Sequence, residues 1–156
     1  MATISRFNTT LQNLEYRLRA FKDNLPQLLE EVVRDKEDVI IAAIANDQLY
    51  RRGVNGRDVK IMDYEPYAIS TIRRKQKKGQ PTTRVTLKDT GEFYESMFVV
   101  FDDEGFYITS NDDKAKYLVK KYGKAIFRLT DKNLTRILRS HIRKELVKRI
   151  KQAARK

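Results

Sequence analysis

The spacing of apolar residues constrains this chain more than any other feature, because it is helical at both ends and alternating in the middle. Near the C-terminus, five aliphatic side chains recur at every fourth position: Leu134, Leu138, Ile142, Leu146 and Ile150. Residues spaced in this way share one face of an α-helix. The pattern therefore predicts a long C-terminal helix over residues 130–154.

Two further helices are predicted near the N-terminus, over residues 8–23 and 26–50. Pro26 separates them, since a proline fits the first turn of a helix better than its interior. Gly53 is placed to end the second helix, because glycine readily adopts the left-handed conformation that closes helices.

The middle of the chain carries strand patterns. Residues 83–89 alternate apolar and polar side chains, and residues 97–101 and 106–110 are joined by a connection of hairpin length. A short helix is predicted over residues 113–122. The sequence thus predicts an α+β fold, with N-terminal helices and a long C-terminal helix packed around a small antiparallel sheet with a hairpin.

A length of 156 residues suits a single domain. Within it we distinguish a helical N-terminal region (1–52), a loop and sheet region (53–129) and a basic C-terminal helix (130–156). The chain has no cysteine and only one histidine, His141, which excludes thiol catalysis, disulfide frameworks and multi-histidine metal sites. It also lacks a membrane-spanning run and a signal-peptide pattern, so we expect a protein made in a cytoplasm.

Positive charge is concentrated in two segments. The net charge is +12, with 33 Lys and Arg against 21 Asp and Glu. Residues 132–156 carry a net +9 and residues 73–84 a net +6, so the rest of the chain is weakly acidic. Local positive segments indicate an anionic partner, either nucleic acid or the acidic surface of a neighbouring subunit.

The first basic segment is predicted to be an exposed loop that follows a short helical turn over residues 64–72. Flexible basic loops bind phosphates by Coulomb attraction and counterion release, and Tyr64 and Tyr67 nearby are able to stack on bases. The alternative is a solvated or protein-facing loop. The residues that would contact DNA or a partner are Arg73, Arg74, Lys75, Lys77, Lys78 and Arg84.

The C-terminal helix carries the second set of candidate contact residues on its polar side: Arg136, Arg139, Arg143 and Lys144. These cations would contact DNA or an acidic neighbouring subunit, or they would only keep the helix solvated. Binding to a membrane surface is disfavoured, because the apolar stripe has no Trp or Phe to anchor it.

The acidic clusters are explained by turns and helix starts. A small metal-dependent nuclease would use Lys88, Asp89 and Glu92, but their spacing matches no nuclease motif. We therefore expect no enzyme, with no catalytic, metal-binding or cofactor-binding residues.

One segment resembles a known family. Thr90-Gly91-Glu92-Phe93-Tyr94-Glu95-Ser96 resembles the TG-x-[LF]-x-x-S signature of small tailed-bacteriophage proteins, which are called virion morphogenesis, minor capsid or tail-completion proteins. The order of features over residues 45–135 is similar as well: Gln48-Leu49-Tyr50, Gly53, Tyr67, Lys75, Gly79, Leu87, Thr90-Gly91 and Tyr122-Gly123. Where many members have a glutamate and a Gly-Thr after the tyrosine, this chain has Lys120, Lys121 and Lys124.

The resemblance implies a non-catalytic structural protein of the virion, located at the head–tail junction and assembled in the host cytoplasm. It implies a homo-oligomeric ring around the DNA channel, with portal, adaptor or tail proteins as partners and nonspecific contact with the genome. A small basic protein that binds nucleic acid without sequence specificity is the alternative.

The signature also has a physical interpretation. Thr90 and Gly91 would form a turn in which Gly91 takes a conformation that a side chain would resist. Phe93 and Met97 would anchor a short helical turn in the core, and Ser96 would form a local hydrogen bond. On this interpretation the motif is architectural.

Overall fold

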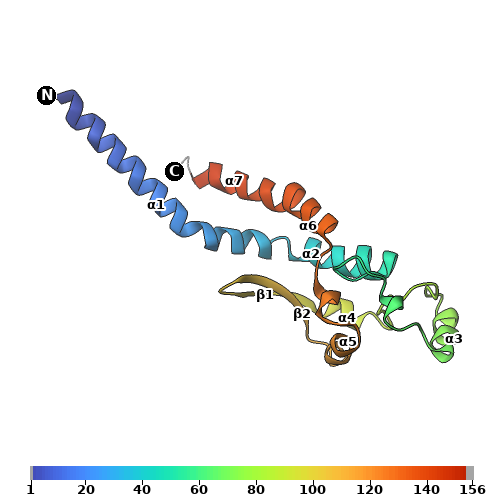
Figure 1. The fold of residues 1–156 in the computed structure, drawn as a ribbon. Helices are drawn as coiled ribbons and strands as arrows, with labels where there is room; N and C mark the ends of the chain where they lie inside the picture. The colour runs from blue at the N-terminus through green and yellow to red at the C-terminus, as the bar shows by residue number, and fades with distance from the viewer. Residues whose placement is uncertain (1, 154–156) are drawn as a thin grey trace.

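The structure is a computed structural model that describes residues 2–153, with side chains described from residue 12 onward except that of Leu14. The N-terminal part contains α1 (Ala2–Arg34), α2 (Glu37–Ala42) and the π-helix η1 (Ala43–Arg52). The middle contains the 3-10 turn η2 (Ile61–Asp63), α3 (Ile69–Lys77), α4 (Glu92–Glu95), β1 (Met97–Asp102) and β2 (Gly105–Ser110). The C-terminal part contains α5 (Ala115–Tyr122), the 3-10 turn η3 (Lys124–Phe127), α6 (Asp131–Ile137), the π-helix η4 (Leu138–Ile142) and α7 (Arg143–Ala153). The fold is therefore α+β, as predicted (Figure 1).

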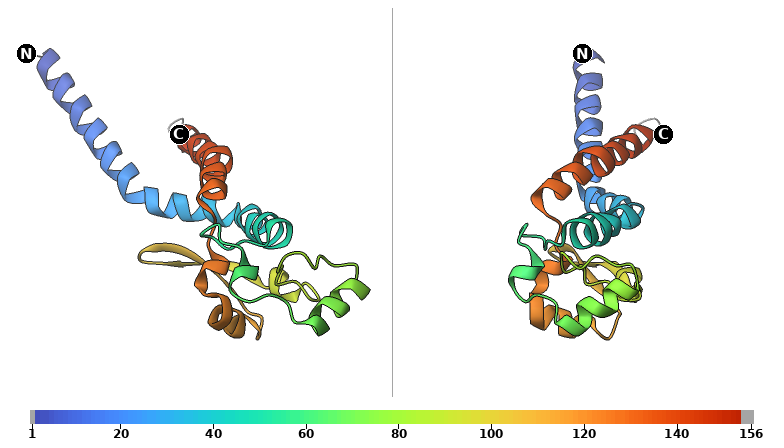
Figure 2. Two further views of the ribbon diagram at one scale, coloured as in Figure 1. Left: turned by 45° about the vertical axis from the view of Figure 1, so that its right-hand side comes forward. Right: turned by 90° about the vertical axis from the view of Figure 1, so that its right-hand side faces the viewer.

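The prediction of two helices separated at Pro26 is wrong, because α1 is one helix with Pro26 inside it. A proline inside a helix kinks it without always ending it, and α1 bends along its length (Figure 1). The chain breaks instead at Asp35 and Lys36, between buried Val33 and buried Ile40. As a result, α1 projects as an arm beyond the rest of the molecule (Figure 2).

The second predicted helix is confirmed at its C-terminal end. α2 and η1 continue one another as far as Arg52, and Gly53 follows with a positive φ of 62°. A side chain at Gly53 would be strained in that conformation and would also lie against Arg84.

The predicted hairpin is confirmed, since β1 and β2 pair antiparallel from Met97 opposite Ser110 to Asp102 opposite Gly105. The predicted strand over residues 83–89 is wrong. Its neighbouring residues Val85 and Thr86 are both fully buried, so the apolar-polar alternation does not reflect one buried and one solvated face. Leu87, with a positive φ of 56°, also interrupts the extended backbone.

The prediction of a short helical turn followed by an exposed basic loop is wrong. The helix α3 begins later, at Ile69, and includes most of the basic stretch. The helix ends at Lys77, and the turn that follows it includes Gly79, whose φ is +63°. The helix places one lysine, Lys75, on the side that faces the body.

The C-terminal helix is confirmed in extent, and the Thr130 side chain caps it by accepting a hydrogen bond from the Asn133 amide. Its predicted apolar face is partly wrong, since Leu134 and Leu138 are exposed while Ile137 and Ile142 are buried. The π-helix η4 adds a residue to one turn and so shifts the phase of the buried side. The helix predicted over residues 113–122 is also confirmed, although α5 begins two residues later.

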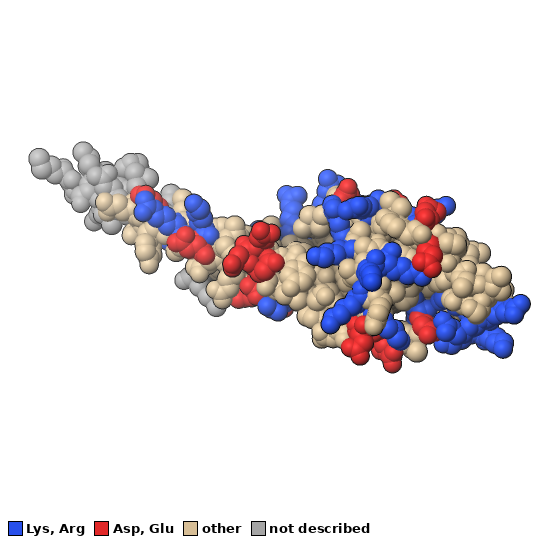
Figure 3. Space-filling model, turned by 60° about the horizontal axis from the view of Figure 1, so that its bottom comes forward, with Lys and Arg blue, Asp and Glu red and all other residues tan. Residues whose placement is uncertain are grey.

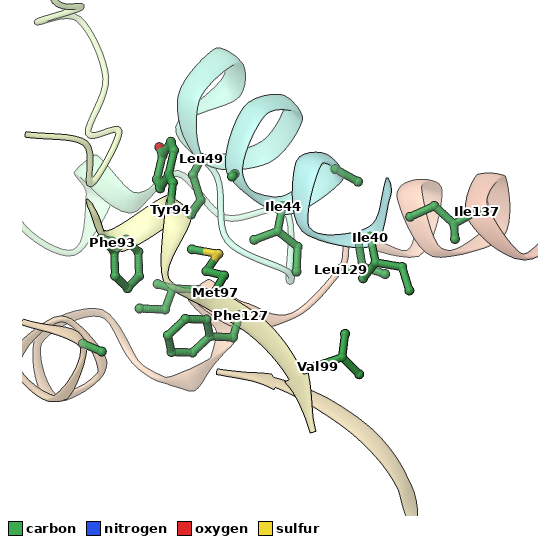
Figure 4. Packing of buried hydrophobic residues seen from close by; sticks show 14 of the residues in the cluster. Ile40, Ile44, Leu49, Phe93, Tyr94, Met97, Val99, Phe127, Leu129 and Ile137 are labelled. Atoms are coloured by element: carbon green, nitrogen blue, oxygen red, sulfur yellow. The ribbon is translucent and has the colours of Figure 1, made fainter. Parts of the chain in front are cut away.

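One hydrophobic cluster draws on all three parts of the chain, from Val32 in α1 to Ile142 in η4. Figure 4 shows Ile44 and Leu49 of the N-terminal part facing Met97 of β1 and Phe127 of η3 across this cluster. Among the described residues, no helix is long and apolar enough to cross a membrane.

Candidate functional site

The basic helix α3 is attached to the body through Lys75, which is only 5% exposed. Its ammonium donates to the backbone carbonyl of Lys88 at 2.6 Å and to Gln80 Oε1 at 3.0 Å, and it lies 3.5 Å from Thr86 Oγ1. The same ammonium lies 5.0 Å from the centre of the Tyr67 ring, a favourable cation–π distance. Lys75 is therefore part of the fold, and the prediction that it is an exposed contact residue is wrong.

The segment around Thr86, which contacts Lys75, is bound by two tyrosine hydroxyls. Tyr67 Oη accepts a hydrogen bond from the Thr86 amide at 2.9 Å, and Tyr94 Oη donates to the Thr86 carbonyl. Burial raises the pKa of the Tyr94 phenol far above its usual value, because the ionised form would lose its hydration. Tyr94 is therefore a neutral hydrogen-bond donor at any physiological pH.

The signature segment follows directly and forms the turn that leads into β1. Thr90 Oγ1 accepts from the Glu92 amide and donates to the Glu92 carboxylate. Gly91 has a φ of 117°, and its carbonyl accepts from the Tyr94 amide at 2.8 Å. This geometry agrees with the turn that the sequence predicts.

The rest of the signature joins this turn to the core. Phe93 is buried, with its ring centre 5.7 Å from that of Phe127. Ser96 Oγ donates to the Phe93 carbonyl and lies 2.7 Å from Ser110 Oγ on the neighbouring strand. The architectural interpretation of the motif is consistent with each of these contacts.

Lys78 and Arg84 also bind within the chain. Lys78 Nζ lies 2.6 Å from Asp89 Oδ1, and this hydrogen bond holds the pKa of the Asp89 carboxyl below its usual range. Arg84 Nε donates to the Tyr50 carbonyl at 2.6 Å. Both side chains stabilise the surroundings of α3, which reduces the number of predicted cations that are free to meet a partner.

Three cations of the first predicted set remain turned to solvent: Arg73, Arg74 and Lys77. Within the described part of the chain, none of them forms an ion pair. Figure 3 shows Lys and Arg gathered at the end of the body that lies away from the α1 arm, where Figure 1 places α3. These three side chains on a well-anchored helix form the basic surface of α3.

The second predicted set divides in a similar way. Arg136 pairs with Asp47 of η1 at 2.8 Å, whereas Arg139, Arg143 and Lys144 are exposed. The two sets are not brought together, because α3 and α7 lie apart in both views of Figure 2, with the rest of the body between them. A single ligand would therefore meet one set or the other.

A pocket of about 250 Å³ lies between α3, the signature turn and α5. Five lysine and arginine residues take part in its lining: Arg74, Lys75, Lys88, Lys114 and Lys121. Lys121 is paired with Glu65 at 2.8 Å, which raises the pKa of its ammonium. The pocket extends the basic surface of α3 inward.

The three residues of the alternative nuclease site each contact different partners. Asp89 binds Lys78, and Glu92 binds Thr90 and lies 3.6 Å from Lys114. Lys88 lies over the rings of Tyr50 and Tyr94. Across residues 2–153, no three His, Asp or Glu side chains are grouped to hold a metal ion.

The sequence analysis assigned no structural role to two residues that position the C-terminal part. Gln48 is fully buried, donates to the Arg128 carbonyl at 2.9 Å and accepts from the Thr130 amide at 2.8 Å. Gly56 packs so closely that a Cβ there would lie 2.4 Å from Arg128. A polar residue on an otherwise apolar helix face was the available signal for Gln48, while Gly56 gave none.

Neither a protein-family model, nor a curated protein, nor a solved structure matches this chain in the comparisons with known proteins.

Proposed function

We propose that the chain is a structural subunit of a tailed-phage particle, located at the head–tail junction and assembled as a ring around the DNA channel. It acts through contacts with its own copies, with portal, adaptor or tail proteins, and with the genome. No catalytic step is part of this role. The proposal rests on the resemblance of the Thr90–Ser96 segment and of the feature order around it.

The observation that supports it most is the way the signature is used. Gly91 adopts a turn conformation, Phe93 enters the core and Ser96 connects to Ser110. The residues that resemble the family therefore maintain the fold, as expected for a building block whose surface makes the functional contacts.

The charge distribution suits the same role. Arg73, Arg74 and Lys77 give each subunit a small basic surface, and a ring repeats this surface around its axis. Lysine and arginine that meet phosphates hold DNA without reading its sequence. We expect α3 to face the channel and the C-terminal cations to face protein neighbours.

The test is to delete the gene from the phage or prophage that encodes the chain and to image the resulting particles by electron microscopy. We expect DNA-filled heads without tails, and tailed particles again when the intact chain is supplied from a plasmid. Normal infectious virions without the chain would contradict the proposal.

The basic surface of α3 favours a second candidate, a free protein that binds nucleic acid without sequence specificity. Its test is the salt dependence of duplex DNA binding by the purified chain. Replacing Arg73, Arg74 and Lys77 with Gln should lower the slope of log affinity against log salt by about 2 to 3. The matched control replaces three exposed lysines elsewhere: Lys116, Lys120 and Lys124. Equal slopes for the two triple variants would remove α3 from this role.

A further inference from the structure

Apolar residues follow α1 at alternating spacings of three and four: Leu11, Leu14, Leu18, Phe21, Leu25, Leu28 and Val32. Ile4 and Phe7 extend the same series toward the N-terminus. This is the a/d repeat of a coiled coil, and it forms one continuous seam along a helix. A seam of this length normally packs against another helix.

Among the seam side chains that the structure describes, from Leu18 onward, burial is complete only at the C-terminal end. Val32 is fully buried, and Arg149 of α7 binds Glu31 at 3.2 Å and also Asp35. Toward the N-terminus, Leu18 is 60% exposed and Phe21 is 38% exposed. Figures 1 and 2 show α1 continuing well past the last described turn of α7.

A groove of about 640 Å³ lies where the covered and uncovered parts of the seam meet. Its apolar lining comes from both helices, with Leu18, Phe21 and Leu28 on α1 and Ile150 and Ala153 on α7. An uncovered apolar face continuous with a packed interface indicates a further helix. The arm also needs one, because a projecting helix gains most of its stability from packing of its apolar face.

We propose that the N-terminal part of α1 binds α1 of a second copy of this chain, and that the two helices run antiparallel. The charges beside the seam decide the direction. With Leu18 at an a position, Glu15 and Lys22 occupy e positions and Arg17 a g position. In an antiparallel pair, e positions face e positions, so Glu15 of each copy meets Lys22 of the other. A parallel pair would instead place Arg17 opposite Lys22 twice, which is repulsive.

Such a contact has two-fold symmetry and uses the same surface on both copies, so it produces a dimer of the free chain. The inference goes beyond the proposed function and does not depend on it. In a phage, the dimer would be the form of the chain before it joins a larger assembly.

The test is the mass of the purified full-length chain in solution, by sedimentation equilibrium over a range of concentrations. We expect a dimer, and a monomer with unchanged body unfolding for Leu18→Glu combined with Phe21→Glu. The matched control places the same charges on the hairpin, as Phe106→Glu with Tyr107→Glu, and should remain dimeric. A monomeric intact chain, or an oligomer that the α1 variant leaves intact, would overturn the inference. Neither result depends on the phage experiment.

Charge reversals test the direction. Lys22→Glu should weaken the dimer about tenfold, because two attractive pairs become repulsive. Adding Glu15→Lys should restore it. In a parallel pair, Lys22→Glu would create attraction to Arg17 and strengthen the dimer, and this result would overturn the antiparallel assignment.

Discussion

The ammonium of Lys75 is held by oxygen atoms of uncharged groups and by an aromatic ring. The Lys88 carbonyl, Gln80 and Thr86 supply the oxygens, and Tyr67 supplies the ring. Burying a polar group costs much less free energy when such dipoles replace its hydration. Through these contacts, a single side chain anchors the basic helix α3 to the body.

Replacing Lys75 with Ala should therefore reduce the free energy of unfolding by about 2 kcal/mol, since the half-buried Lys88 carbonyl would lose its donor and the contacts of Lys75 with Gln80 and Tyr67 would be lost. Lys77→Ala, two positions along the same helix but exposed, should change it by less than about 0.5 kcal/mol. Urea denaturation of the two variants checks this. Equal losses would show that Lys75 does not anchor α3.

The ion pair between Lys78 and Asp89 should make the stability of the chain depend on pH. The hydrogen bond from Lys78 lowers the pKa of Asp89 in the folded chain, so the folded state binds a proton less readily than the unfolded state. Its contribution to stability is present above the unfolded pKa of about 3.9. It is lost as the pH falls below that value, through the folded pKa. A carboxyl NMR titration should give Asp89 a pKa below the usual range for aspartate. In the Lys78→Met variant this pKa should rise back into that range, and an unchanged pKa would show that Lys78 is not the cause of the shift.

At the scale of elements, apolar periodicity predicts the hairpin, α5 and the C-terminal helix, because local spacing is enough to form them. It fails where contacts between residues far apart in the sequence determine the local structure. Residues 83–89 look like a strand, but their polar groups bind Lys75, Tyr67 and Tyr94 instead of another strand. The free cations of the candidate site could not be separated from Lys75 by sequence for the same reason, since burial of Lys75 depends on a segment that follows it.

The signature turn is the element on which the resemblance depends, and Phe93 is its anchor. Phe93→Ala should lower the free energy of unfolding by about 3 kcal/mol or more, because it opens a cavity beside Phe127. Phe106→Ala, on the exposed hairpin, should lower it much less. Thermal denaturation checks the difference, and similar melting temperatures would contradict an architectural role for the motif.

At the scale of the whole molecule, the chain consists of a packed body and a projecting arm. The side chains described between residues 12 and 24 are exposed or half-buried, and burial begins only at Val32. Deleting residues 2–24 should therefore leave the body folded, with a free energy of unfolding within about 1 kcal/mol of the intact chain. Urea denaturation monitored by circular dichroism checks this. A body that no longer unfolds cooperatively would show that the arm is part of the core.

We propose above all that this chain is a building block of a particle, with α3 directed at the genome. The most direct measurement is a cryo-electron microscopy reconstruction of the head–tail junction in the phage that encodes it. We expect a closed ring of copies of this fold, with Arg73, Arg74 and Lys77 lining the channel. A junction that contains no copy of the fold would contradict it.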